Sequence, residues 1–85
     1  MISIAVFSYD DTVRRLTRDK IQDWLIDSHT MAKVTLFEHL DDIMTMPARY
    51  DIYILDMDAG PHVIEMSKMI MDNDPNAFCV FTSVV

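Results

Sequence analysis

The sequence predicts one α/β domain built on a parallel sheet, and three observations favour this fold class. Four short runs, at residues 2–7, 33–37, 52–55 and 78–82, are rich in the β-branched and aromatic residues typical of strands. The segments between them carry apolar residues at helical spacing. The run at 52–55 has no polar alternation, as expected for a parallel strand that is covered on both faces. Strands that alternate with helices form right-handed βαβ units, so we expect helices on both faces of the sheet.

The first half of the chain shows this alternation clearly. The strand at 2–7 ends in Ser8-Tyr9-Asp10-Asp11, a polar segment rich in residues that cap helices. A helix is predicted from Thr12 to about Ile26, where one stripe holds Val13, Leu16, Ile21, Trp24 and Leu25.

The second half repeats the pattern. After the strand at 33–37, a short helix is predicted from Glu38 to about Met46, and Pro47 stops it. The third strand ends at Asp56, and 58–61 is predicted to be a turn. A helix from His62 to about Asp72 and a strand at 78–82 complete the pattern. His62 is interpreted as a residue that starts this helix.

Length and charge limit the classes of function. Eighty-five residues, 51% of them hydrophobic, support one domain over 1–85. A net charge of −7 and a pI near 4.5 argue against contact with nucleic acid or an anionic membrane, and favour a cationic partner or a metal. No segment approaches the roughly 20 apolar residues of a membrane span, and the N-terminus lacks a basic region before an apolar one. A cytoplasmic protein is therefore expected.

Cysteine and glycine content excludes further classes. The single cysteine, Cys79, cannot form an internal disulfide and lies in an apolar run, so it is interpreted as a packing thiol. One glycine, Gly60, cannot build a Gly-rich phosphate loop. A dinucleotide or flavin cofactor is therefore not expected.

Four carboxylates follow two of the predicted strands. If the first and third strands are neighbours in a flavodoxin-like sheet, their carboxyl ends meet, and the loops with Asp10 and Asp11, and with Asp56 and Asp58, face each other. Clustered carboxylates need a compensating cation, and oxygen ligands suit Mg²⁺. In the alternative interpretation, Asp10 and Asp11 only cap the first helix.

The chain resembles the receiver domain of two-component response regulators, over all 85 residues. The resemblance rests on the strand Ile4-Ala5-Val6-Phe7 with its Asp-rich turn, on Tyr50-Asp51-Ile52-Tyr53-Ile54-Leu55-Asp56, and on Phe78-Cys79-Val80-Phe81-Thr82-Ser83. The opening strand is most similar to receivers that precede a LytTR-type DNA-binding domain, which would make the role transcription regulation. No such domain is present in these 85 residues.

The resemblance implies a signalling phosphoacceptor domain and not an enzyme. Asp56 would take a phosphoryl group from a histidine kinase and form an acyl phosphate. Mg²⁺ would be held by Asp10 and Asp11, by the Asp56 carboxylate and by the backbone carbonyl of Asp58. Thr82 would be the switch hydroxyl that contacts the phosphoryl group.

Three departures from the family pattern favour an alternative. Ser8 and Tyr9 align with the family's acidic pair unless the turn slips by one or two residues. The loop after Asp56 differs and is one residue shorter. The chain stops after its fourth strand, so the final strand, its lysine and the last two helices have no counterpart. The alternative is a pseudo-receiver, an interaction or dimerisation module without phosphoryl chemistry.

The early stop predicts exposed apolar surface. A fourth strand left at the edge of the sheet, with less cover on both faces, invites a homodimer through that edge or those faces. A fragment, a degenerate gene product or an intertwined dimer would each account for the stop. Met1 is consistent with a natural N-terminus, so the truncation is expected at the C-terminus.

Overall fold

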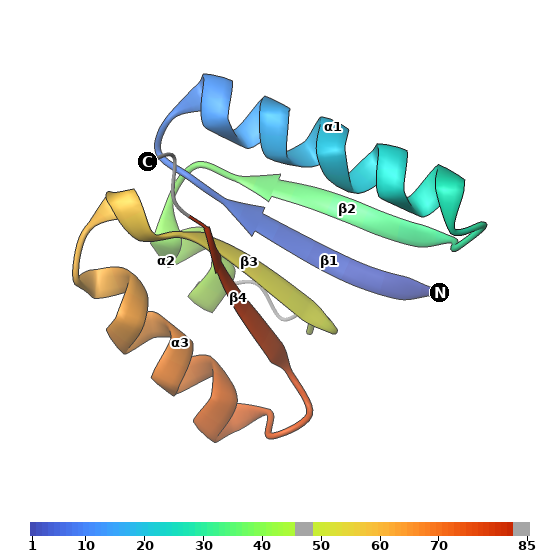
Figure 1. The fold of residues 1–85 in the computed structure, drawn as a ribbon. Helices are drawn as coiled ribbons and strands as arrows, with labels where there is room; N and C mark the ends of the chain where they lie inside the picture. Colours follow the sequence, from blue (N-terminus) through green and yellow to red (C-terminus); the bar gives the residue numbers. More distant parts are fainter. Residues whose placement is uncertain (46–48, 83–85) are drawn as a thin grey trace.

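The computed structural model describes residues 1–45 and 49–82, which form a four-stranded parallel sheet with helices between the strands (Figure 1). The elements are β1 (Ile2–Phe7), α1 (Asp11–Asp27), β2 (Ala32–Phe37), α2 (Leu40–Thr45), β3 (Ile52–Asp56), a 3₁₀ turn η1 (Met57–Ala59), α3 (His62–Asn73) and β4 (Phe78–Thr82). The strand order is β2-β1-β3-β4, and every pairing is parallel. This confirms the predicted incomplete, flavodoxin-like doubly wound sheet.

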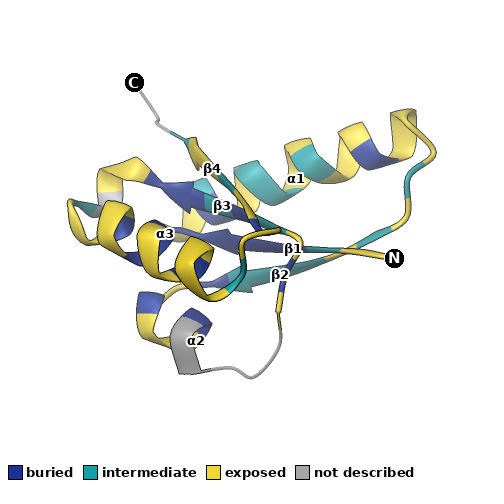
Figure 2. Ribbon diagram, turned by 90° about the horizontal axis from the view of Figure 1, so that it is seen from below, coloured by how far each residue is buried: buried dark blue, intermediate teal, exposed yellow. Residues whose placement is uncertain are grey.

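The sheet separates two layers of helix. Figure 2 shows α1 on one side of the sheet and α2 with α3 on the other. The main core lies on the α2 and α3 side, where side chains at alternate positions of β1 and β3 point. Its buried members are Ala5, Phe7, Phe37, Leu40, Ile43, Tyr50, Tyr53, Leu55, Val63, Met66, Ile70 and Ala77.

Aromatic rings fix the segment that leads into β3. The rings of Phe37 and Tyr50 meet edge to face with centroids 5.7 Å apart, and Tyr50 meets Tyr53 in the same way at 5.7 Å. The Tyr50 amide donates a 3.2 Å hydrogen bond to the Tyr53 hydroxyl. Asp51 adds a link to β1, because its carboxylate accepts a 2.8 Å hydrogen bond from the Ser3 amide. These contacts set the register that brings Asp56 beside the end of β1.

The opposite face of the sheet is only half covered. Ile4 and Val6 of β1 are buried on the α1 side. In the strand register, Val6 is paired with Ile54, and Ile54 with Val80, so the three side chains share this face. Exposure rises along that row, since Ile54 is partly buried and Val80 is 43% exposed. The α1 helix therefore covers the β1 half and leaves the β3–β4 half open.

Most predicted boundaries agree with the structure to within one or two residues. The strands at 2–7 and 78–82 match, and α3 begins at His62 as predicted. The predicted turn at 58–61 is present, and its first part is the 3₁₀ turn η1, which begins at Met57 with the Asp56 carboxylate accepting from the Asp58 amide. Gly60 ends this turn with φ of 106°, a value that L side chains rarely adopt. Met46, Pro47 and Ser83 lie outside the described residues.

None of the helices in the described ranges is both long and apolar enough to cross a bilayer.

Candidate functional site at the carboxyl end of the sheet

The strand register decides which residues meet at the carboxyl end of the sheet. Phe7 is paired with Leu55, so the residues that follow them, Ser8 and Asp56, leave neighbouring strands side by side. Asp56 is also paired with Thr82 on β4. The structure therefore brings Ser8, Asp56 and Thr82 together at the carboxyl end of the sheet.

Ser8 and Asp56 form the centre of this site. The Ser8 hydroxyl donates a 2.7 Å hydrogen bond to Oδ2 of Asp56. Both residues are buried, with 1% of Ser8 and 5% of Asp56 exposed. The other carboxylate oxygen, Oδ1, accepts a 2.9 Å hydrogen bond from the Asp58 amide. Each oxygen of Asp56 thus has a protein donor, which lowers the cost of burying a carboxylate.

Asp10 caps the first helix. Its Oδ1 accepts hydrogen bonds of 2.8 Å from the Thr12 amide and 3.2 Å from the Val13 amide, and its backbone is extended, as at an N-cap. Its own amide donates to the Ser8 hydroxyl at 3.1 Å. The geometry of Asp10 therefore matches the capping interpretation.

Asp11 is engaged with arginines of α1. Its Oδ1 lies 2.8 Å from Nη2 of Arg14, and its Oδ2 lies 3.1 Å from Nε of Arg15. These are i, i+3 and i, i+4 pairs along the helix. The carboxylates of Asp10 and Asp11 thus both bind groups of α1.

Arg14 is a site residue that the sequence interpretation missed. It is 7% exposed, and its Nη1 donates a 2.7 Å hydrogen bond to the backbone carbonyl of Ser8. Nη2 binds Asp11 and lies 3.6 Å from Glu38. The i, i+3 spacing of Asp11 and Arg14 was the available signal, but helical periodicity placed Arg14 beside the apolar stripe and not within it.

Tyr9 is the second residue after β1, and its phenol side chain supplies no carboxylate to the site. Its ring stacks edge to face on Phe7, with centroids 5.0 Å apart, and the residue is 54% exposed. It forms one wall of a hollow of about 300 Å³ between the first turns of α2 and α3, where His62 and Glu65 also lie. The strand register places Ser8 beside Asp56, and Tyr9 follows it in the turn after β1.

The donor set does not fit Mg²⁺ well. No three His, Cys, Asp or Glu side chains within residues 1–45 and 49–82 are grouped so that they could hold a metal ion. Magnesium sites in proteins use carboxylates with open positions for water, and here each oxygen of the one buried carboxylate already accepts a hydrogen bond, from Ser8 or from the Asp58 amide. The structure does not gather the predicted set of Asp10, Asp11, Asp56 and Asp58 into one group.

Two further features lie away from Asp56. Burial raises the pKa of the Cys79 thiol, which disfavours the thiolate and agrees with the packing interpretation.

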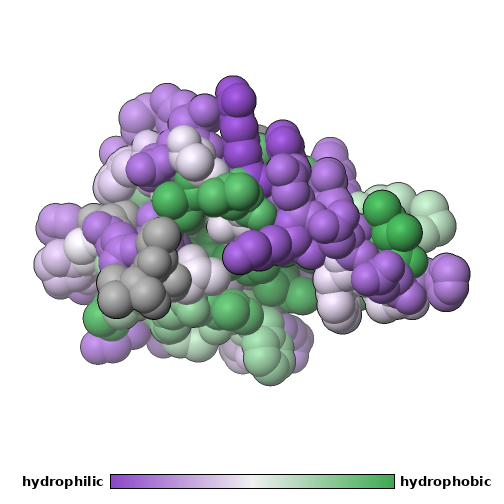
Figure 3. Space-filling view, turned by 45° about the horizontal axis from the view of Figure 1, so that its top comes forward, coloured by the Kyte–Doolittle hydropathy of each residue, from purple (hydrophilic) through white to green (hydrophobic). Residues whose placement is uncertain are grey.

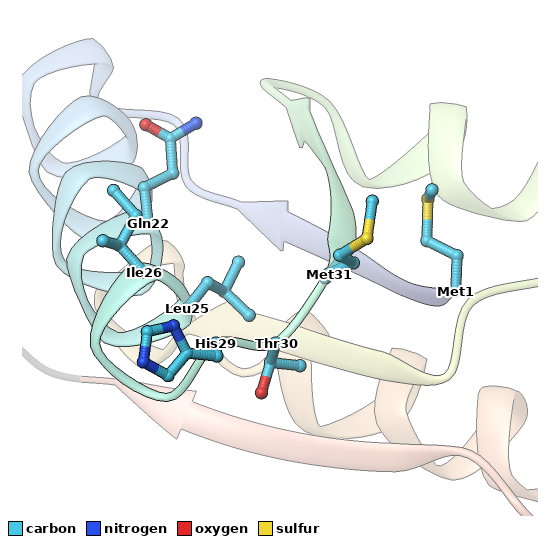
Figure 4. A pocket seen from close by; sticks show the side chains of 8 residues that line it. Met1, Gln22, Leu25, Ile26, His29, Thr30 and Met31 are labelled. Carbon is cyan, nitrogen blue, oxygen red and sulfur yellow. The ribbon is translucent and has the colours of Figure 1, made fainter.

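A cavity of about 580 Å³ opens at the other end of the sheet, between Met1, the last turn of α1 and the start of β2 (Figure 4). Its walls are mainly apolar, with Gln22, His29 and Thr30 as polar members, so it lacks a converging set of reactive groups.

Comparisons with known proteins support the fold class. No model of a known protein family matches the sequence, and no curated protein matches it. Among solved structures, the chain is similar to one described as "BeF3 Activated DrrB Receiver Domain", with a TM-score of 0.79 and 20% sequence identity. The match covers 100% of this chain and 68% of that one. The chain therefore has the fold of a response regulator receiver domain.

Proposed function

We propose that this chain is a signalling module of the receiver class that acts by binding a protein partner, without metal-assisted phosphorylation of Asp56. One observation carries the proposal, namely the buried hydrogen bond from Ser8 to Asp56 at the position where the resemblance expects an acidic residue. A hydroxyl in that position supplies no negative charge for a divalent cation. Asp56 then serves as a buried acceptor that ties β3 and η1 to the end of β1.

The loss of the metal would remove most of the chemistry. Phosphoryl transfer depends on positioning and on cations that neutralise the charge of the transferred group. Near Asp56 the described part of the chain offers Arg14, but its guanidinium is already bonded to the Ser8 carbonyl and to Asp11. A phosphoryl group on Asp56 would also form on an oxygen that accepts from the Ser8 hydroxyl or from the Asp58 amide.

A second candidate keeps Asp56 as the phosphoacceptor. The strand register favours it, because Asp56 is paired with Thr82, the residue that the resemblance makes the switch hydroxyl. In this candidate the partner is a histidine kinase in the cytoplasm, Mg²⁺ is bound with help from water, and phosphorylation regulates transcription through an output domain. In both candidates the net charge of −7 argues against nucleic acid contact by this segment.

Intact-mass spectrometry separates the two candidates. The 85-residue chain is incubated with Mg²⁺ and acetyl phosphate, and an Asp56→Asn variant is treated in parallel. We expect no phosphoryl adduct on either protein. An adduct that forms on the native chain and is absent from the Asp56→Asn variant would establish the second candidate and overturn the first.

A further inference from the structure

An open groove lies beside α1 on the half-covered face of the sheet. Its volume is about 450 Å³. Val13, Leu16 and Ile21 of α1 form one wall, while Ile54 of β3 and Val80 of β4 form the floor. Figure 3, in which the α1 side is turned forward, shows hydrophobic side chains exposed among hydrophilic ones.

The exposed side chains on this face belong to one apolar surface. Leu16 and Trp24 lie on α1 and are 56% and 58% exposed, and their spacing of eight residues places them on the same side of the helix. Phe78 and Val80 lie on β4 and are 70% and 43% exposed. With roughly 150–250 Å² for a whole aromatic side chain, these four residues expose on the order of 400 Å². That area is in the range of the largest apolar patch of a typical monomer, and such patches are often binding sites.

We infer that a second copy of this chain covers this face, with the open β3–β4 half of each copy packed against the open half of the other. Such a two-fold arrangement interlocks two half-covered sheets, so that each α1 lies next to the β4 edge of its partner. The inference deepens the proposed function, because it names the partner of the interaction module.

Charge favours a second copy at this surface. The chain carries a net charge of −7, so two copies repel each other when acidic surfaces meet. The groove lining includes one charged residue, Lys20, and no carboxylate. β4 itself, Phe78–Thr82, contains no charged residue. Contact through the groove and β4 therefore brings no carboxylates of the two copies together.

The area and the β4 edge also fit a dimer. The exposed apolar side chains supply about half of the ~800 Å² that each partner buries in a stable interface. The partly buried Ile54 and the β4 edge supply more. Among the described residues β4 pairs with β3 alone, so its outer edge presents backbone groups that a neighbouring chain can cover.

Sedimentation velocity of the 85-residue chain tests the inference. We expect a dimer at micromolar concentration, and a monomer for Val80→Lys and for Leu16→Lys. Ile64→Lys is the matched control, because Ile64 is 42% exposed on α3, on the other side of the sheet, and we expect it to leave the dimer intact. Circular dichroism confirms that each variant is folded.

The remaining outcomes are decisive. A native chain that stays monomeric at high concentration would overturn the inference. A dimer that Val80→Lys disrupts and Leu16→Lys leaves intact would overturn it in favour of pairing through the β4 edge. If Val80→Lys is unfolded, Leu16→Lys alone carries the test. A phosphoryl adduct on Asp56 would refute the proposed function while leaving the sedimentation result unchanged, so the two proposals fail separately.

Trp24 provides a second measurement. It is the single tryptophan of the chain and is 58% exposed on the same side of α1 as Leu16. We expect its fluorescence to shift to shorter wavelength as protein concentration rises, with no shift in Leu16→Lys. An unchanged emission maximum across a monomer-to-dimer transition would place the contact elsewhere and contradict the inference.

Discussion

The Ser8 hydroxyl donates a 2.7 Å hydrogen bond to Oδ2 of Asp56, and both side chains are buried at the carboxyl end of the sheet. A carboxylate in this environment depends on its donors, because hydrogen bonds to charged groups contribute more than those between neutral groups. Ser8 thereby supplies, through a neutral hydroxyl, part of the stabilisation that a cation supplies in a metal site.

Replacement of Ser8 by alanine is expected to lower stability. Ser8→Ala leaves Oδ2 of Asp56 without its donor, which costs about 1.5–3 kcal/mol of unfolding free energy by urea denaturation. Ser67→Ala is the control, since Ser67 is also buried but donates to a helical carbonyl, that of Ile64. A cost below about 1 kcal/mol is expected there. Equal losses of unfolding free energy in the two variants would show that the hydrogen bond to Asp56 contributes no more than one to a backbone carbonyl.

A carboxylate introduced at position 8 is expected to create a magnesium response. In Ser8→Asp, two buried carboxylates lie side by side and repel each other, so the variant unfolds at a lower temperature than the native chain. Mg²⁺ should raise the unfolding temperature of Ser8→Asp part of the way back to that of the native chain. The unfolding temperature of the native chain should change no more in Mg²⁺ than in NaCl of equal ionic strength. A native chain that Mg²⁺ stabilises as strongly as the variant would contradict our interpretation of the site.

Variants of Asp10 distinguish a helix cap from a metal ligand. Asp10→Ala removes the acceptor for the Thr12 and Val13 amides and should cost about 1 kcal/mol. Asp10→Asn should retain most of this stability, because asparagine is an equally good cap. The difference in unfolding free energy between each variant and the native chain should be the same with and without Mg²⁺. A loss in Asp10→Asn that appears only in the presence of Mg²⁺ would indicate a ligand role.

The Cys79 thiol is expected to react slowly at neutral pH. Burial raises its pKa, so the thiolate fraction at pH 8 is smaller than in the unfolded chain. The raised pKa in the folded state means that its contribution to stability is complete below the unfolded pKa and is lost as pH rises through the folded value. Alkylation by iodoacetamide should therefore accelerate with pH and on addition of urea. Equal rates in native buffer and in urea would contradict this expectation.

The sequence alone predicted the order and nearly all the bounds of the elements. Local patterns sufficed for this, because strand and helix periodicities differ and each break contains polar residues, proline or glycine. The helical form of the turn after β3 was missed since it depends on Asp56 accepting from the amide two residues later. That bond joins two residues of the same turn, and helical or strand periodicity carries no sign of it.

The site was harder to predict because it depends on contacts between distant segments. The sequence left open whether Ser8 and Tyr9, or Asp10 and Asp11, occupy the positions of the acidic pair. The pairing of Phe7 with Leu55 places Ser8 beside Asp56, and this contact joins residues that are 48 positions apart. Arg14 was missed because helical spacing cannot show that a guanidinium folds back onto a strand end.

The bond between Arg14 and the Ser8 carbonyl has a consequence for local opening of the fold. It links two residues six positions apart and so joins the end of β1 to the first turn of α1. Neither segment can separate from the other without exposing a buried guanidinium. Amide protons in the two segments should therefore exchange with solvent deuterium in a single cooperative opening, while those in the last turn of α1 exchange independently.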